Sequence, residues 1–222
     1  MARPLEDSAY KMYRSESGIR NSLRKIYPYY FFAPEWVANK FTKQGKAYRD
    51  LGGMVEQGKL ILSKYPITHG YNYFYHKVYE FDCDRSRFYE GDDHGRALQV
   101  TEINIRGKIF QVGNIHGSYS REKYDTKKSL LQSEFIIRKL KEKKLPTVLV
   151  GDFNVLPTTK SIAILNKEYK NLNKMFNITT SLPDGRVIDY IFTSKEWKAK
   201  SFRVGTTDIS DHYPLVAELT LS

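Results

Sequence analysis

The 222-residue sequence predicts a single α/β domain built from mostly antiparallel β-sheets. Three observations predict this class: short apolar runs that end at polar or glycine residues, two stretches with helical periodicity, and a hairpin signal between two of the runs. The expected strands outnumber the expected helices. No internal repeat or linker divides the chain, so we treat residues 1–222 as one domain.

The first part of the chain is expected to contain one helix and two buried strands. Isoleucine and leucine recur at helical spacing within residues 16–27, which predicts a helix there. The apolar runs at 29–32 and 58–63 predict buried strands, of which the first should end at Pro34. Residues 39–57 are polar, basic and interrupted by glycine, so they predict a surface loop.

The second part of the chain is expected to combine strands with a long helix. A short Arg-Gly-Lys connection predicts a hairpin between strands at 97–105 and 109–116. The amphipathic stretch 126–143 predicts a helix. Its expected apolar face consists of Leu130, Leu131, Phe135, Ile137 and Leu140. Three further apolar runs predict strands at 147–150, which should be central, at 187–193 and at 215–221.

Charge and cysteine content limit the classes of function. Lysine and arginine total 36 against 25 acidic residues, and the net charge of +11 favours a polyanionic partner such as nucleic acid or an anionic membrane surface. No apolar run reaches the roughly 20 residues of a transmembrane helix. The single cysteine, Cys83, excludes an internal disulfide framework and a cysteine-based zinc site. Because the N-terminus also carries no secretory signal, we expect an intracellular, cytoplasmic protein.

Polar side chains are concentrated at the ends of the expected strands, where α/β sheets commonly bind ligands. One of them, Asp189, lies in an apolar run, where an ionised carboxylate needs a partner, and histidine is a natural one. Each residue alone would also suit a turn, a helix cap or a rim position, but together they indicate one site. The set is His116, Asp152, Asn154, Asp189, Asp211 and His212.

In these motifs the sequence resembles the endonuclease/exonuclease/phosphatase superfamily of metal-dependent phosphoesterases. The resemblance extends from about residue 27 to the end of the chain. It implies a four-layered sandwich of two mostly antiparallel β-sheets flanked by helices, with the active site at one edge. It is not specific for one substrate. The segments that carry it are 60–67, 114–116, 151–154, 188–192 and 210–212.

The resemblance implies hydrolysis of a phosphate ester by in-line attack of water, assisted by Mg²⁺ or Mn²⁺. Asp152 would orient or deprotonate the water and contribute to the metal site. Asn154 would hold a phosphate oxygen or help to bind the metal, and Asp211 would help to hold the cation. Oxygen ligands of this kind suit Mg²⁺, which takes only one or two protein carboxylates beside the substrate phosphate.

The resemblance also assigns roles to the two histidines. Asp189 would orient and charge His212, which would contact the phosphate as an electrostatic stabiliser or proton-transfer group. His116 would contact a non-bridging oxygen. Such groups are needed because the anionic phosphodiester repels nucleophiles unless charge on the phosphoryl oxygens is neutralised.

The sequence departs from the family pattern at its N-terminus. Members normally begin with a strand that ends in a catalytic asparagine, followed by a Gln-Glu strand end whose carboxylate binds the metal, and neither motif is found here. We therefore expect an N-terminally incomplete domain that lacks the usual first strand. Glu6 either replaces the missing carboxylate or is a solvated residue of the terminus. Without a replacement, the enzyme should be weak or inactive.

The predicted function is that of a Mg²⁺-dependent phosphodiesterase or nuclease acting on DNA or RNA. Two alternatives stay open: a catalytically impaired module that binds phosphate or nucleic acid, and an enzyme acting on phospholipid or inositol phosphate. The aromatic segment 71–76 fits either base stacking or strand packing, and residues 92–94 are expected to form a polar turn. Substrate choice should depend on the loops expected near 38–57, 72–93 and 117–125.

Overall fold

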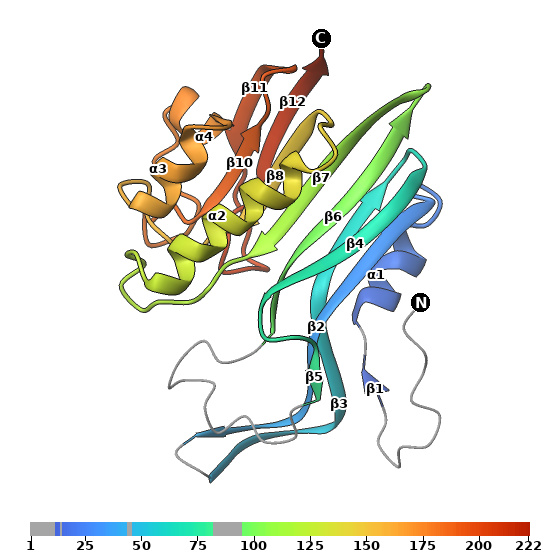
Figure 1. Ribbon diagram of the computed structural model, residues 1–222. Coiled ribbons are helices and arrows are strands. Elements are labelled where there is room, and N and C mark those ends of the chain that lie inside the picture. Colours follow the sequence, from blue (N-terminus) through green and yellow to red (C-terminus); the bar gives the residue numbers. More distant parts are fainter. Residues whose placement is uncertain (1–11, 14, 44–45, 82–94) are drawn as a thin grey trace.

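The computed structural model describes residues 12–13, 15–43, 46–81 and 95–222 (Figure 1). Its helices are α1 (Ser15–Leu23), α2 (Lys127–Lys141), α3 (Lys160–Asn166) and α4 (Leu172–Met175). Its strands are β1 (Met12–Tyr13), β2 (Tyr29–Lys43), β3 (Lys46–Ser63), β4 (Ile67–His76), β5 (Glu80–Phe81), β6 (Arg96–Ile105), β7 (Lys108–His116), β8 (Thr147–Asp152), β9 (Lys170–Asn171), β10 (Asp189–Thr193), β11 (Trp197–Val204) and β12 (Leu215–Leu221). Glu6, Cys83 and residues 92–94 lie outside the described residues.

A six-stranded sheet with the order β4-β6-β7-β8-β10-β9 forms the centre of the molecule. Its pairings are antiparallel except for β7 and β8, which are parallel. The crossover between these two strands carries α2, as parallel neighbours require a long connection. The expected hairpin of β6 and β7 and the expected central position of β8 are confirmed.

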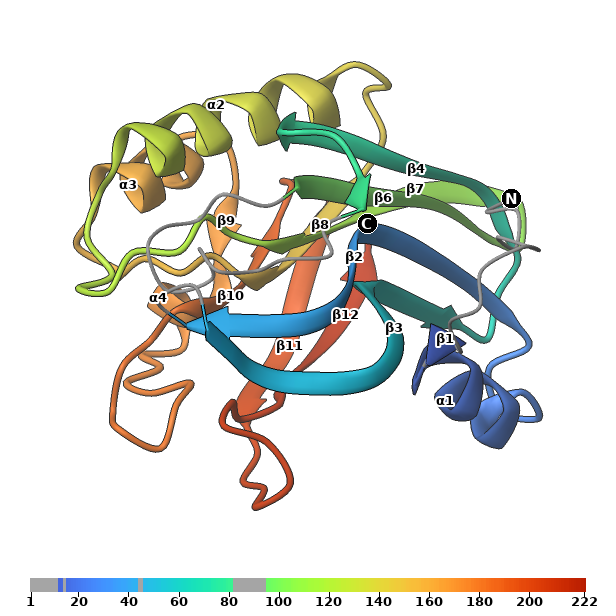
Figure 2. The ribbon, with the colours of Figure 1, turned by 90° about the horizontal axis from the view of Figure 1, so that it is seen from below.

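Helices and smaller sheets cover the two faces of the central sheet. Figures 1 and 2 show α2 and α3 on one face, with the β2–β3 and β11–β12 strands on the other. One hydrophobic core lies under α2 and α3 and includes Leu98, Ile136 and Phe192. A second core lies on the opposite face and includes Phe110 and Trp197, whose rings meet edge to face at 5.1 Å. This confirms the expected mixed α/β class with layered sheets and helices.

The prediction of a surface loop over residues 39–57 is wrong for the part of this segment that the structure describes. Strand β2 continues to Lys43 and β3 begins at Lys46, and the two strands pair antiparallel as far as these ends. Pro34 does not end β2, because a register shift beside it accommodates the missing donor. Backbone hydrogen bonds need no apolar side chains, so the composition of this segment concealed a long hairpin.

The expected end of the first helix and the expected apolar face of the long helix also need correction. Helix α1 ends at Leu23 rather than near residue 27, and Ile19 is 47% exposed. On α2, Leu131 is 55% exposed, whereas Ile136 and Leu140 are buried. The buried side of α2 includes small and amide side chains that an apolar pattern does not detect, namely Ser129, Gln132 and Ser133. Seven elements were not anticipated: the strands β1, β4, β5, β9 and β11 and the helices α3 and α4.

The aromatic segment of β4 packs within the fold. Tyr71, Tyr73 and Tyr75 lie against the core beneath α2, and the rings of Tyr71 and Tyr73 stack on each other at 5.5 Å. Their ring faces therefore meet neighbouring side chains of the same strand, which supports strand packing over base stacking. Among the helices of the described residues, none is long and apolar enough to cross a membrane.

Candidate active site

Three adjacent strands of the central sheet bring three of the predicted residues into one row. His116, the last residue of β7, pairs in register with Asp152 at the end of β8. Asp189, the first residue of the antiparallel β10, pairs with Asp152 from the other side. Backbone register therefore places His116, Asp152 and Asp189 side by side at one edge of the sheet.

Gly151 allows β8 to approach β7 closely just before Asp152. Its φ of +131° is a backbone conformation that side chains with a Cβ rarely adopt. A Cβ built at this position would lie only 2.0 Å from the carbonyl oxygen of Ile115. Glycine is thus required here for the backbone path that directs Asp152 into the site.

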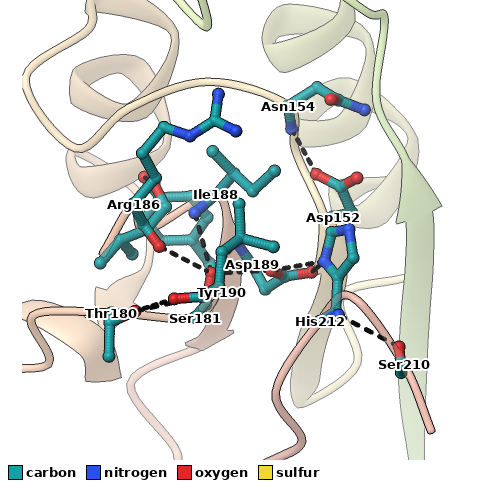
Figure 3. Close-up of polar contacts among 12 residues, drawn as sticks. Asp152, Asn154, Thr180, Ser181, Arg186, Ile188, Asp189, Tyr190, Ser210 and His212 are labelled. Atoms are coloured by element: carbon teal, nitrogen blue, oxygen red, sulfur yellow. Dashed lines mark hydrogen bonds and ion pairs between the residues drawn. The ribbon is translucent and has the colours of Figure 1, made fainter. Parts of the chain in front are cut away.

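His212 and Asp189 form a hydrogen-bonded pair, as the sequence predicted. Nδ1 of His212 lies 2.9 Å from Oδ2 of Asp189 and 3.0 Å from Oδ1 (Figure 3). The hydrogen bond with Asp189 raises the pKa of His212, partly offset by burial, and the charges of Asp189, Asp152 and Asp211 add to the increase. The Asp189 carboxylate therefore favours the protonated imidazolium.

Ser181 holds the Asp189 carboxylate from the opposite side. Its hydroxyl donates to Oδ2 of Asp189 at 2.7 Å and accepts the backbone N–H groups of Ile188 and Asp189. The carbonyl of Ser181 accepts the N–H of Tyr213, which follows His212 in the chain. Ser181 is fully buried, so this arrangement fixes both members of the Asp189–His212 pair.

The surroundings of Asp152 make its ionisation harder than that of a solvated carboxyl in the absence of a cation. Burial, followed by the charge of Asp189, raises its pKa from 3.8 to about 6, although the Asn154 N–H, His212 and Lys123 act in the opposite direction. Oδ1 of Asp152 accepts the backbone N–H of Asn154 at 2.7 Å, and Oδ2 lies 3.8 Å from Nε2 of His116. A positive charge bound here would be strongly favoured.

Asn154 is buried beside Asp152, with both ends of its amide engaged. Oδ1 accepts a hydrogen bond from Nζ of Lys123, and Nδ2 donates to the carbonyl of Gly117 at 3.2 Å. Its backbone adopts φ = +57°, which asparagine tolerates better than most residues. These bonds tie the end of β8 to the loop that follows β7. The direct contact of Asn154 with metal or phosphate stays a prediction.

The predicted residues open into a cavity of about 1010 Å³. Asp211 lines it and is exposed, without joining the tight group that His212 forms with the two aspartates. The loops after β7 and before β10 add Tyr119, Lys123 and Arg186, which sequence reasoning missed. These residues lie outside the apolar strands, so a search for polar residues at strand ends could not find them. Only the expectation that the loop at 117–125 affects substrate choice pointed to the region of Tyr119 and Lys123.

Asp152, Asp189 and His212 each offer a ligand atom, and these atoms all lie within 4.8 Å of one another. Because His212 and Asp189 are bonded to each other, Asp152 is the carboxylate best able to serve a cation. Its oxygens, with those of Asp211 at the cavity wall, are donors that suit Mg²⁺ or Mn²⁺. The donor chemistry therefore fits a hard divalent cation.

The fold and this site agree with a comparison against protein families. The sequence model of the Endonuclease/Exonuclease/phosphatase family matches residues 12–212. The chain therefore belongs to this family, whose members hydrolyse phosphoester bonds. The resemblance seen in the sequence is confirmed.

Solved structures of the same family share the fold. An endonuclease/exonuclease/phosphatase from Bacteroides vulgatus has 20% identity and a TM-score of 0.66, over 96% of this chain and 83% of that one. The human Nocturnin catalytic domain with bound sulfate has 14% identity and a TM-score of 0.68, over 91% and 75%. The Bacteroides thetaiotaomicron mannosyl-6-phosphatase has 17% identity and a TM-score of 0.59, over 90% and 80%. No curated protein matches the sequence.

Proposed function

We propose that the protein is a Mg²⁺- or Mn²⁺-dependent phosphodiesterase that acts on nucleic acid. The observation that carries this proposal is the convergence of Asp152, Asp189 and His212, whose ligand atoms lie within 4.8 Å of one another at the edge of one sheet. A carboxylate beside a histidine–carboxylate pair can orient a water and neutralise a phosphoryl oxygen in the same cavity.

The chain's own residues divide the work of in-line attack by water. Asp152 accepts a hydrogen bond from the attacking water and, when ionised, draws its proton. His212, held and charged by Asp189, donates from Nε2 to a phosphoryl oxygen, since Nδ1 is engaged with Asp189. His116 lies at the rim beside Asp152, where it contacts a second phosphoryl oxygen.

A divalent cation would be held by Asp152, with Asp211 and Asn154 contributing from the cavity wall. When bound, it supplies positive charge that neutralises the phosphoryl oxygens. Its charge also favours the ionised form of Asp152, which burial alone disfavours.

The charge of the protein supports nucleic acid as the substrate class. The chain carries a net charge of +11, and Arg121, Lys123 and Arg186 line the same cavity as the acidic residues. Cations beside a phosphodiester site bind the flanking phosphates of a polynucleotide. The paired His212 and Asp189 support an enzyme over a module that only binds phosphate, because binding does not need a histidine held in a single orientation.

A substrate panel tests the proposal. Single-stranded DNA, abasic DNA and inositol phosphates are incubated with the protein and Mg²⁺ or Mn²⁺, with and without a chelator. We expect chelator-sensitive hydrolysis of nucleic acid, lost by at least about 100-fold in Asp152→Ala and His212→Ala. Asp208→Ala is the matched control, because Asp208 is an exposed carboxylate of the same final loop that does not line the cavity.

The other outcomes identify the alternatives. Salt-dependent binding of nucleic acid without hydrolysis in the presence of either metal would contradict the proposal and support a binding module instead. Hydrolysis of inositol phosphates but not of nucleic acid would contradict nucleic acid as the substrate class. Full activity in Asp152→Ala would show that the chemistry occurs elsewhere.

A further inference from the structure

The loop between β7 and α2 places an aromatic ring at the rim of the cavity. Tyr119 lines the cavity and is 53% exposed. Nζ of Lys123 lies 4.0 Å from the centroid of its ring, a cation–π distance. The same Nζ donates to Oδ1 of Asn154, whose backbone N–H is bonded to Asp152. A continuous set of contacts therefore links the Tyr119 ring to the proposed reacting centre at Asp152.

The rest of the loop is anchored, so the position of this ring is defined. The carbonyl of Lys123 accepts the N–H of Leu156 at 2.8 Å, and the N–H of Ser118 donates to the side chain of Gln132 at 2.8 Å. Lys123 itself is buried and has φ = +59°. These bonds tie the loop to the segment after β8 and to α2. Tyr119 is the aromatic side chain that this loop contributes to the cavity lining.

The surroundings of Tyr119 suit a nucleoside attached to a phosphate. Arg121 lines the cavity from the same loop, and Arg186 lines it from the loop before β10. Leu182 and Pro183 add apolar wall. A cavity of about 1010 Å³ is far larger than one phosphate group and falls at the upper end of the size range of small-molecule sites. An aromatic ring beside cations is the combination with which proteins bind single-stranded nucleotides.

We propose that Tyr119, whose ring packs against the Lys123 ammonium group, stacks on the nucleobase of the nucleotide next to the scissile phosphate. This inference rests on the proposed function and names a specificity subsite within it. The base stacks on the exposed part of the ring, while Arg121 contacts the flanking phosphate. A substrate with a base at this position is therefore preferred over one with a bare sugar.

A thermodynamic cycle between substrate and protein tests this subsite. The hydrolysis of a thymidine dinucleotide is compared with that of two analogues, each with an abasic ring on one side of the phosphate. We expect loss of the base on one side to lower kcat/KM by about tenfold in the wild type and by less than about twofold in Tyr119→Leu. Tyr119→Phe should retain the preference, and Tyr124→Leu, an exposed tyrosine outside the cavity lining, should not alter it.

A binding measurement separates this inference from the proposed function. Calorimetry compares the affinities of thymidine 3′,5′-bisphosphate and of the abasic deoxyribose bisphosphate, without any need for turnover. An affinity ratio of about ten that disappears in Tyr119→Leu and survives in Tyr119→Phe supports the subsite even if no diester is hydrolysed. Equal affinities, or a preference that Tyr119→Leu keeps, would overturn it even where hydrolysis of dinucleotides is observed.

Discussion

Nδ1 of His212 lies within 3.0 Å of both carboxylate oxygens of Asp189. The two residues are 23 positions apart, and they meet because β10 begins at Asp189 while the segment before β12 returns past the same strand end. The Ser181 hydroxyl donates a further hydrogen bond to Oδ2 of the same carboxylate. The pair therefore has one orientation, with Nε2 as the nitrogen available to a ligand in the cavity.

Asp189→Asn is expected to lower the pKa of His212. The Asp189 carboxylate is the main cause of the raised value, and a neutral amide of the same shape removes its charge. The stability that the pair supplies is full below about pH 6.5 and is lost as the pH rises through the higher folded pKa. NMR titration of the His212 imidazole in the wild type and in the variant checks this. An unchanged pKa of His212 in the variant would contradict the pairing.

Asp152→Asn is expected to stabilise the metal-free protein while abolishing turnover. Burial raises the pKa of Asp152 to about 6, so its ionisation costs stability as the pH rises from about 4 to about 6. At pH 7 the neutral amide avoids this cost, which is on the order of 3 kcal/mol, and its side-chain oxygen can accept the Asn154 N–H in the same way. Urea unfolding at pH 7 and at pH 4 tests this. A gain of equal size at both pH values would exclude ionisation as the cause.

Mn²⁺ binding should weaken as Asp152 takes up a proton. With a pKa of about 6 in the metal-free protein, Asp152 is mostly protonated at pH 5 and mostly ionised at pH 7, so we expect an affinity about tenfold lower at pH 5. Calorimetric titration at the two pH values measures the ratio. Affinity that does not change with pH in this range would mean that Asp152 is not a ligand.

Gly151→Ala should damage the site far more than Gly185→Ala. Both glycines have positive φ, but a Cβ at Gly151 would lie 2.0 Å from the Ile115 carbonyl, whereas at Gly185 it would meet no atom within 4 Å. We expect Gly185→Ala to cost about 1 kcal/mol and Gly151→Ala at least about 3 kcal/mol or failure to fold. Chemical denaturation compares the two. Equally small losses would show that β8 does not approach β7 this closely.

The sequence predicted the centre of the fold well because its strands are apolar and its turns are distinctive. The hairpin of β6 and β7 carries a glycine turn, and β8 is apolar from Val148 to Val150, just before Gly151. The β2–β3 hairpin was missed beyond Pro34, because polar residues can pair through their backbones without any apolar alternation. Helix α2 buries serine and glutamine beside leucine, so its buried face could not be inferred from hydrophobicity alone.

The candidate site was predicted at its strand ends and missed in its loops. Asp152, Asp189 and His212 each adjoin an apolar strand, and the register of the sheet brings the two aspartates side by side. Ser181 and Lys123 lie in connections with no periodicity, and only the three-dimensional path of these loops brings them to the site. A serine or lysine in a polar loop carries no local signal that distinguishes it from a solvated residue.

The most direct test of the central claim is a double-mutant cycle on hydrolysis of single-stranded DNA with Mg²⁺ or Mn²⁺. Asp152→Ala and His212→Ala are measured separately and together, with folding of each variant verified by circular dichroism. Because both residues act on one phosphoryl group, each single change should lower kcat by about 10³-fold and the double change by little more. Losses that multiply, or full turnover in either single variant, would contradict a shared active site.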